Sequence, residues 1–296
     1  MENLVLFHTG TELPLFLNVT FAQIRAFNPE AEVYFLTDKQ HLKNTLFDNY
    51  NIHALNKDDF YSDKIHLFEK NYKYAPDNFW SLTATRLIYI EKFMLDCGLE
   101  NMYHFDNDVL LYYNLCKYHE HFKRLYAHIA ITPGGPNENI AGFIFIKTGK
   151  SLADMTQFFV DTLQTYGMGA GAKYHVGLIC EMRLMKIYEI EKGKEFLGHL
   201  PVLPFGKHSE NYSEFNAIFD SASWGQFVGG THKGKTPGAK TASQYVGQLL
   251  REHPEYAVIW TKDNEDRKIP YFKYDNNEVK INNLHIHSKQ LSKYRS

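Results

Sequence analysis

Two acidic residues, Asp106 and Asp108, stand between apolar runs in the stretch MYHFDNDVLLYYN, which spans residues 102–114. In an extended chain, residues i and i+2 face the same side, so both carboxylates could lie together at the end of a strand expected at Met102–Phe105. Two carboxylates at close range repel unless a cation lies between them. Mg²⁺ or Mn²⁺ commonly takes carboxylate oxygens together with phosphate oxygens. The pair therefore indicates a metal ion that neutralises a diphosphate.

The competing interpretation of these acids is a turn, because Asp and Asn side chains hydrogen-bond to nearby backbone groups. The sequence DND does not exclude it. A calcium loop is disfavoured, because Leu110 stands where a further oxygen ligand would be needed. The surrounding stretches must decide between a metal site and a turn.

The composition indicates one large folded unit of 296 residues, either a single α/β domain or a domain with an added lobe. Hydrophobic residues make up 44% and aromatic residues 15%, which is ample for a packed core and argues against disorder. With 32 basic and 34 acidic residues the net charge is −2, so no basic field favours nucleic acid as a partner. An anionic ligand must be held by a local site.

No stretch has the length and apolar content of a transmembrane segment, and the run Leu4–Phe7 is too short for a signal peptide. The three cysteines, Cys97, Cys116 and Cys180, show neither metal-ligand spacing nor a disulfide pattern. These observations favour a reducing compartment, and the expected location is the cytoplasm.

The N-terminal segment predicts the strand–helix–strand unit of a parallel sheet. Leu4–Gly10 and Val33–Asp38 are short apolar runs typical of buried strands, and Pro14–Phe27 has apolar residues close to helical spacing. Sheets of this kind bind ligands beyond the carboxyl ends of their strands. Three polar residues are expected there: His8, Thr9 and Asp38.

Further elements follow along the chain. Asn78–Gly98 is the longest helical pattern, His128–Gly135 and Ala141–Gly149 are strand candidates, and Ser151–Tyr166 is expected to be a helix with Ser151 as its cap. The last third is rich in proline and glycine and is expected to be rich in loops. The alternation of strands and helices predicts an α/β fold.

The stretch HFDNDVLLY resembles the Asp-x-Asp motif of nucleotide-sugar glycosyltransferases with the GT-A fold, and five further stretches resemble theirs in order along nearly the whole chain. These are LFHTGTELPLFLNVTFAQIRAFNPEAEVYFLTD, FWSLTATRLIYIEKFM, AGFIFIKTG, FDSASWGQFVGG and INNLHIHSKQL, the last two resembling bacterial and viral members. The resemblance implies a GT-A type α/β fold, in which helices flank a Rossmann-like, mixed and mainly parallel sheet.

The resemblance also implies roles for individual residues. It assigns Asp106 and Asp108 to the donor diphosphate and to a metal ion, Mn²⁺ or Mg²⁺, with Asn107 in the same motif. It places Gly142 in the strand that lines the sugar pocket and Arg86 in a helix near the donor. Arg86 is expected to hold either a phosphate or Asp106, against the alternative of a surface ion pair.

One stretch departs from the family pattern. Members carry Asn-Asp-Met in the helix after the sugar-pocket strand, where this chain has Cys180, Glu181 and Met182. An inverting transferase needs a base for the acceptor hydroxyl, and Glu181 and Asp220 are the two candidates. Either acid could instead bind sugar hydroxyls only. Inversion is the expectation, and retention stays open.

The C-terminal stretch LHIHSK alternates, so in an extended chain His285, His287 and Lys289 share one face. A neutral imidazole can ligate a divalent metal, and a lysine supplies positive charge for phosphate. In several GT-A families a histidine completes the metal site and a lysine contacts the diphosphate, and the resemblance implies the same here. His287 is preferred slightly over His285. The alternative is a solvated basic tail, given Lys293 and Arg295.

The sequence GGTHKGKT, Gly229–Thr236, fits the phosphate-binding pattern G-x-x-x-x-G-K-T. That motif requires a buried strand before it and a helix that begins at its Lys-Thr. The preceding SASWGQFV is not a strong strand, and Pro237 and Gly238 stand where the helix should continue. The segment is therefore expected to be a loop that could close over a phosphate-bearing donor. Its basic residues are Lys233, Lys235 and Lys240.

These observations predict a single glycosyltransferase domain, with residues 1–115 as the nucleotide-binding half and residues 116–296 as the sugar and acceptor half, including a metal- and phosphate-binding tail. The expected reaction moves a hexose or pentose from a UDP-linked donor to a glycan hydroxyl, as in polysaccharide biosynthesis, with Lys289 assisting catalysis at the diphosphate. Two other classes stay open: a P-loop nucleotide hydrolase that uses Gly229–Thr236, and a relative that binds nucleotide-sugar without turnover.

Overall fold

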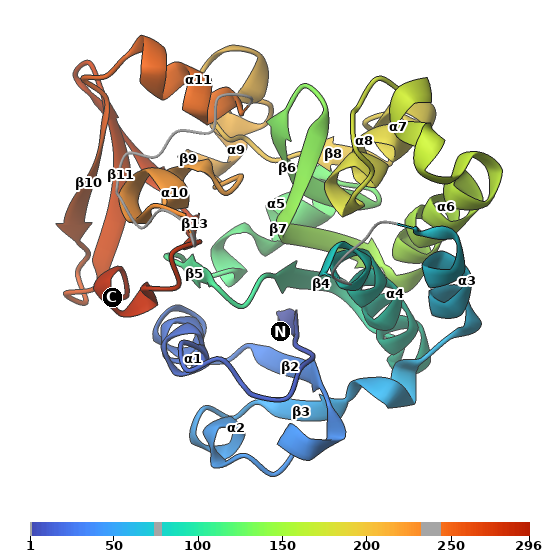
Figure 1. The fold of residues 1–296 in the computed structure, drawn as a ribbon. Helices are drawn as coiled ribbons and strands as arrows, with labels where there is room; N and C mark the ends of the chain where they lie inside the picture. The colour runs from blue at the N-terminus through green and yellow to red at the C-terminus, as the bar shows by residue number, and fades with distance from the viewer. Residues whose placement is uncertain (1, 74–78, 232–243) are drawn as a thin grey trace.

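The computed structural model describes residues 2–73, 79–231 and 244–296. Within these residues a seven-stranded sheet crosses the molecule in the order β3-β2-β1-β4-β7-β6-β8 (Figure 1). Strand β7 runs antiparallel to both of its neighbours, and the other pairs are parallel. The strands are β1 (Asn3–Phe7), β2 (Glu32–Thr37), β3 (His53–Asn56), β4 (Glu100–Phe105), β6 (Ile129–Gly135), β7 (Glu138–Thr148) and β8 (Leu197–His199). The predicted mixed, mainly parallel sheet is confirmed.

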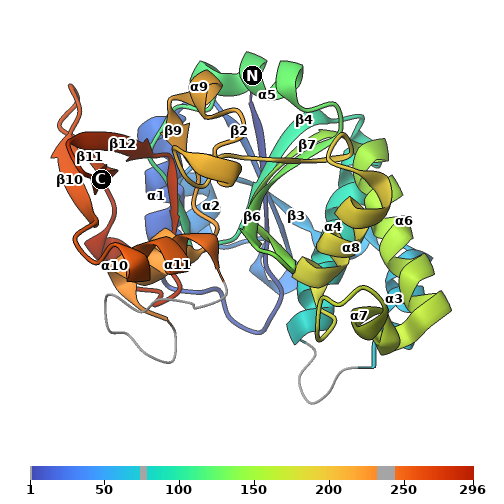
Figure 2. The same ribbon diagram turned by 90° about the horizontal axis from the view of Figure 1, so that it is seen from above.

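Helices cover both faces of this sheet (Figure 2). One face carries α3 (Asp63–Asn71), α4 (Phe79–Cys97), α6 (Gly149–Tyr166), α7 (Ala170–Lys173) and α8 (Glu181–Lys192). The other carries α1 (Leu17–Phe27), α2 (Thr45–Asn49), α5 (Cys116–Leu125) and α9 (Tyr212–Phe215). Successive residues of a strand point to opposite faces, so Val5 packs in the first core while Leu4 and Leu6 pack in the second.

The predicted N-terminal strand–helix–strand unit is confirmed. β1 pairs in parallel with β2, Leu4 beside Val33, and the helix α1 connects them. The pairing continues past the strand end, where the His8 N–H donates to the Leu36 carbonyl at 2.9 Å. The polar residues that follow β1 and β2 therefore lie at one edge of the sheet, as such a unit requires.

The last third, expected to be rich in loops, also contains a sheet and helices that the sequence did not indicate. A four-stranded sheet, β10-β11-β12-β9, forms there with helices α10 (Ser223–Gly229) and α11 (Tyr245–Glu252) around a third core. Its strands are β9 (Ala217–Ile218), β10 (Ala257–Lys262), β11 (Lys268–Tyr274) and β12 (Asn277–Ile281). Trp224 is fully buried there and packs on Phe272 with ring centroids 4.6 Å apart.

A two-stranded sheet joins this C-terminal unit to the centre of the chain. β13 (Asn283–His285) pairs antiparallel with β5 (Val109–Leu111), which follows the Asp106–Asp108 stretch. Leu284 and Ile286 are fully buried, and the Ser296 N–H donates to the Gln23 side chain of α1 at 2.9 Å. The alternative of a solvated basic tail is therefore wrong.

The cap of helix α6 differs from the one expected from the sequence. Helix α6 begins at Gly149, and its cap is Thr148, whose hydroxyl accepts from the Ser151 N–H at 3.1 Å. Ser151 itself is therefore not the cap.

The stretch before the P-loop-like sequence forms helix α10, so the strand that the motif requires is not there. Residues 232–236 of that motif, with Lys233 and Lys235, and also Lys240, lie outside the described residues.

Among the helices that the structure describes, none combines the length and apolar character needed to cross a membrane. All three cysteines are free thiols, and Cys180 is the buried one.

A partly buried carboxylate ties the β6–β7 hairpin region to helix α8. One oxygen of Glu189 accepts from Asn139 at 2.8 Å and lies 3.0 Å from Lys186 Nζ and 3.2 Å from His199 Nε2. Burial opposes ionisation, but His199, Asn139 and Lys186 together lower the pKa of Glu189 to about 2.

Replacing this carboxylate should produce a pH-dependent loss of stability. The folded-state pKa of Glu189, about 2, lies below the ordinary value of 4.5, so the charge stabilises the folded protein fully above about pH 4.5 and loses that effect as the pH falls through about 2. At pH 7, Glu189→Gln should lower the free energy of unfolding by about 2–3 kcal/mol. Urea unfolding of the native protein and of Glu189→Gln, at pH 7 and at pH 3, measures the loss of stability at each pH. The exposed Glu278→Gln is the control, and an equal loss at both pH values would contradict the assignment.

Candidate functional site

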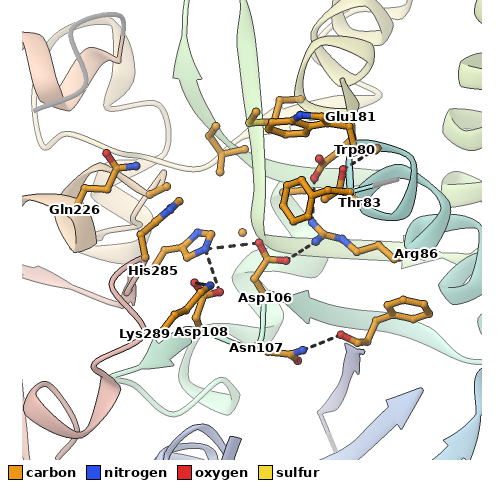
Figure 3. Close-up of a pocket in the computed structure, with 18 of the residues that line it drawn as sticks. Trp80, Thr83, Arg86, Asp106, Asn107, Asp108, Glu181, Gln226, His285 and Lys289 are labelled. Atoms are coloured by element: carbon orange, nitrogen blue, oxygen red, sulfur yellow. Dashed lines mark hydrogen bonds and ion pairs between the residues drawn. The ribbon is translucent and has the colours of Figure 1, made fainter. Parts of the chain in front are cut away.

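A cavity of about 1000 Å³ opens at the carboxyl ends of β1 and β4. Its walls come from segments far apart in the sequence (Figure 3). They are the end of β1, the start of α4, residues 106–108, strand β7, the start of α8, helix α10 and residues 285–289. This is the edge of the sheet at which open α/β folds bind ligands.

The two acids that the sequence singles out lie in a turn between β4 and β5, and not in an extended strand. The Val109 N–H donates to the Asp106 carbonyl at 2.9 Å, and the Asp106 N–H donates to the Gly142 carbonyl at 3.1 Å. The extended geometry expected for Asp106 and Asp108 is therefore wrong. The carboxylates still meet, because the turn directs both side chains into the cavity.

Arg86 projects from α4 and lies between two carboxylates. Its Nη1 is 2.7 Å from Asp106 Oδ1, and its Nη2 donates to Glu181 Oε1 at 3.0 Å. The side chain is 12% exposed, which excludes a surface ion pair. Burial opposes the charge, yet the surrounding carboxylates raise the pKa of Arg86. Of the two roles expected for Arg86, the structure shows the contact with Asp106.

Asp108 is the most enclosed acid of the motif, with a side chain that is 5% exposed. Its Oδ1 lies 3.2 Å from His285 Nε2, and its Oδ2 accepts from Lys289 Nζ. Burial opposes ionisation, but His285 and Lys289 hold the pKa of Asp108 well below its usual range. Burial also disfavours a charged imidazole, yet Asp108 raises the pKa of His285. The carboxylate is therefore ionised and paired.

Backbone pairing brings His285 to this acid across the length of the chain. His285 lies opposite Val109 in the β13–β5 pair, and the Ile286 N–H donates to the Asp108 carbonyl at 2.8 Å. The chain then turns: the Lys289 N–H donates to the Ile286 carbonyl at 3.0 Å, and Lys289 has a φ of 60°. The expectation that the tail is extended as far as Lys289 is therefore wrong, because the strand ends at His285. The turn, and not strand alternation, returns the lysine to Asp108.

Three side chains could hold a divalent metal ion: one oxygen each of Asp106 and Asp108, and a nitrogen of His285, lie within 4.8 Å of one another. Figure 3 shows His285 and Arg86 on opposite sides of Asp106, with His285 Nε2 3.7 Å from Asp106 Oδ2. Ligands at about 2.0–2.2 Å from an ion are about 3–4 Å apart, so modest adjustment would admit one. Two carboxylates and an imidazole suit Mn²⁺ or a similar ion. The sequence slightly favoured His287 as the ligand, but the histidine of this group is His285. The ring of His287 lies beside it, with ring centroids 4.2 Å apart.

Gly142 contributes through its lack of a side chain. A Cβ at this position would lie 2.6 Å from His285 Nδ1, closer than packed atoms approach. Its carbonyl meanwhile holds the Asp106 N–H. Any larger residue at position 142 would push the imidazole away from the acids.

Asn107 fixes the acidic turn to the N-terminal unit. Its side-chain N–H donates to the Phe7 carbonyl at the end of β1 at 2.9 Å, and its own carbonyl accepts from the Thr20 hydroxyl of α1 at 2.6 Å. The turn is thereby held against both elements of the predicted nucleotide-binding half.

The residues expected at the nucleoside lie together at the ends of β1 and β2. His8 lines the cavity, whereas Thr9 and Asp38 are not among its described lining residues. Asp38 accepts from the Gly10 N–H at 2.8 Å and lies 3.2 Å from Lys57 Nζ. Burial opposes ionisation, but these partners lower the pKa of Asp38. Asp38 thus holds the loop after β1 that carries His8.

The two candidate bases have different surroundings. Glu181 begins α8, is buried and lines the cavity. Burial raises the pKa of Glu181, although Arg86 opposes the shift. Asp220 is fully buried and is not among the lining residues. Its oxygens accept from three backbone N–H groups, those of Trp224, Gly225 and His285. The expectation that Asp220 could act as the base is wrong, because its oxygens are occupied and out of reach.

Several lining residues were not singled out by their sequence. Trp80 and Thr83 share a face of α4 with Arg86, and helical spacing from Arg86 would have found them. Gln226 lies within the stretch FDSASWGQFVGG but was not singled out there, and Gln244 lies outside the stretches that carry the resemblance. They enter the site only through the tertiary fold.

The order of the strands and the helices that cover both faces of the sheet agree with the GT-A glycosyltransferase fold. Mouse xyloside xylosyltransferase 1 has a similar structure, with a TM-score of 0.52 and 12% sequence identity over 72% of this chain and 91% of that chain. The fold implied by the sequence resemblance is therefore confirmed.

Two further solved glycosyltransferases give lower TM-scores. The glycosyltransferase GlyE of Streptococcus pneumoniae TIGR4 gives a TM-score of 0.43 and 13% identity over 76% of this chain, and the match spans 47% of the GlyE chain. The galactosyltransferase LgtC gives 0.35 and 12% identity over 62% of this chain and 69% of that chain. No protein-family model matches the sequence, and no curated protein sequence does.

The pairing of Arg86 with two carboxylates predicts a large and specific loss of stability. Arg86→Met leaves Asp106 and Glu181 without their shared cation, so the free energy of unfolding should fall by about 3–5 kcal/mol. The double variant with Glu181→Gln should recover part of this loss, because one uncompensated charge is gone. The control Lys92→Met breaks an exposed pair with Asp96 and should change stability by less than about 1 kcal/mol. The free energy of unfolding of each variant is measured with urea. Similar losses in Arg86→Met and Lys92→Met would show that the pairing of Arg86 with the two carboxylates is not the cause.

Proposed function

We propose that this protein is a metal-dependent glycosyltransferase that moves a sugar from a UDP-linked donor to a hydroxyl of a glycan. The observation that carries the proposal is the convergence of Asp106, Asp108 and His285 on one wall of a cavity in a GT-A fold. Such a donor set suits an ion that also binds diphosphate oxygens. The ion would be Mn²⁺ or Mg²⁺.

The cavity suits a donor that lies across it. The nucleoside would lie near His8 and Phe16, at the ends of β1 and α1. The diphosphate would lie at the acidic turn, within reach of Lys289, whose side chain is 46% exposed. The sugar would lie between β7 and the start of α8, beside Glu181. This division corresponds to a nucleotide-binding half, residues 1–115, and a sugar and acceptor half, residues 116–296.

A bound divalent ion would supply positive charge that stabilises the diphosphate as it departs. Lys289 would leave Asp108 for a diphosphate oxygen and add a second positive charge there. Arg86 would keep Asp106 oriented, because its guanidinium already binds the carboxylate oxygen directed away from His285.

The reaction breaks the bond between the anomeric carbon and the diphosphate oxygen and forms a bond from that carbon to the acceptor oxygen. The diphosphate takes the electron pair of the broken bond, and Glu181 takes the proton of the acceptor hydroxyl. Attack from the side opposite the leaving group inverts the anomeric centre. The buried position of Glu181 in the cavity wall supports this role.

Two other functions make different predictions. A P-loop hydrolase would lose activity in Lys235→Ala and keep it in Asp108→Ala, and the helical α10 before that segment argues against it. A relative that only binds nucleotide-sugar would be stabilised by the donor without releasing UDP. The free cysteines favour a reducing compartment such as the cytoplasm.

The metal site predicts dependence on both the ion and Asp108. UDP and UDP-sugars should raise the unfolding temperature with Mn²⁺ present and not in EDTA, since a ligand at 100 times its dissociation constant stabilises by about 2.7 kcal/mol. Asp108→Asn should lose this Mn²⁺-dependent shift and at least about 10²-fold in kcat/KM, while it keeps a cooperative unfolding transition. Asp96→Asn, exposed on α4, is the control and should keep both. Full turnover in EDTA would sink the proposed function.

The role of Glu181 predicts a loss confined to turnover. Glu181→Gln keeps the shape of the side chain but cannot take a proton, so kcat should fall by about 10²–10⁴. The Mn²⁺-dependent thermal shift with UDP should remain. NMR of the product should show an inverted anomeric centre in the native enzyme. Near-normal kcat in the variant, or a retained configuration, would show that Glu181 only binds sugar hydroxyls.

A further inference from the structure

The histidine of the proposed metal site has no side-chain partner on its far nitrogen. His285 Nδ1 is buried and makes no hydrogen bond among the described residues, while Nε2 faces the two acids. Metal-binding histidines are usually oriented by a hydrogen bond to the second ring nitrogen. The orientation of this imidazole must therefore come from its backbone and its packing.

The backbone of His285 is held by Asp220. The His285 N–H donates to Asp220 Oδ2 at 2.9 Å. The same oxygen accepts from the Gly225 N–H at 2.8 Å, and Oδ1 accepts from the Trp224 N–H at 2.8 Å. The carboxylate thus binds the first turn of α10 and the proposed metal ligand at once, and it is fully buried.

Strand pairing places Asp220 at this position. β9 and β12 are parallel, with Ile218 beside Ile281, and the Asn282 N–H donates to the Ile218 carbonyl at 2.8 Å. One step further on, the Asp220 N–H donates to the Asn283 side chain at 3.2 Å. The hydrogen bonds between the β9 and β12 segments thus extend beyond the two strands, and they bring Asp220 beside the segment that carries His285.

Close packing leaves His285 little freedom on either side. A Cβ at Gly225 would lie 1.9 Å from the His285 carbonyl oxygen, so α10 approaches the His285 backbone directly. On the other side, Gly142 allows the imidazole to approach β7. The carboxylate of Asp220 connects α10 to His285, because it accepts hydrogen bonds from the backbone of both.

We propose that Asp220 is a positioning residue: it couples α10 to the His285 backbone and thereby sets the affinity of the Asp106, Asp108 and His285 group for a divalent ion. This inference rests on the metal site of the proposed function. Asp220 itself touches neither the ion nor the substrate. It also links ion binding to α10, whose Gln226 lines the same cavity.

A double-mutant cycle with Mn²⁺ alone tests the coupling. Asp220→Asn keeps the shape of the side chain, but its amide nitrogen cannot accept a hydrogen bond, so one side of the carboxylate loses its backbone partners. Mn²⁺ affinity, measured by calorimetry and by the EPR signal of the free ion, should fall about 10–100-fold. His285→Ala should weaken binding by a similar factor. The double variant should bind Mn²⁺ as His285→Ala does, because Asp220 acts only through His285.

Two results of this cycle would overturn the inference. One is a double variant whose loss is the product of the two single losses, since Asp220 would then act independently of His285. The other is an Asp220→Asn variant with native Mn²⁺ affinity. In that second case the native protein still binds Mn²⁺, so the proposed function stands while the positioning role fails. A native protein that does not bind Mn²⁺ at all would overturn both.

Two further variants separate positioning from a general loosening of the C-terminal unit. Ser223→Ala removes the buried hydrogen bond from Ser223 to Gln244 at the start of α10 and does not touch His285. It should lower the unfolding temperature and leave Mn²⁺ affinity within about twofold, as expected for independent sites. An affinity loss equal to that of Asp220→Asn would overturn the positioning role.

Gly225→Ala provides a test that keeps Asp220 intact, in case Asp220→Asn fails to fold. The added Cβ must displace α10 from the His285 carbonyl, so Mn²⁺ affinity should again fall about 10-fold or more, the scale seen when support for a metal ligand is lost. Native affinity in this variant would mean that the contact between α10 and His285 does not govern the ion site, and the inference would be wrong.

Discussion

The rest of the structure depends on the neutralisation of several buried charges at one end of the cavity. A buried carboxylate without a partner costs several kcal/mol, so acids and cations must arrive at this place together. The acids are Asp106, Asp108 and Glu181, and the cations are Arg86, Lys289 and His285 when protonated. They come from the turn after β4, from α4 and α8, and from the C-terminal segment. The site therefore requires that these distant elements pack together.

This constraint explains why the tail is built into the molecule. β13 pairs with β5 directly after the acidic turn, and that pairing brings His285 beside Asp108. Buried apolar residues on β13 and after it keep the segment in place, so the charges need not hold it by themselves. A divalent ion would replace part of the positive charge that His285 and Lys289 now provide. Lys289, the more exposed of the two, would then be available to a phosphate oxygen.

The C-terminal unit has a second task beyond its own stability. Its sheet leads to Asp220, and Asp220 binds the backbone of both α10 and His285. The acid that the sequence offered as a base is thus a structural link whose oxygens are occupied. Glu181, in contrast, contacts Arg86 through one oxygen and lines the cavity. Two carboxylic acids thus have different surroundings, because the hydrogen bonds of the fold occupy the oxygens of Asp220 away from the cavity.

The sequence by itself determined the N-terminal strand–helix–strand unit, the long helix of Arg86 and the place of the acid pair after a strand, because these depend on local periodicity and on residues close together in the chain. Its resemblance to GT-A enzymes predicted the mixed sheet and singled out the two acids of the candidate metal site. Only the tertiary structure decided that His285 and not His287 joins those acids, that Lys289 returns through a turn and that Asp220 is enclosed. These outcomes follow from pairing between strands far apart in sequence, β5 with β13 and β9 with β12, whose register no local pattern encodes.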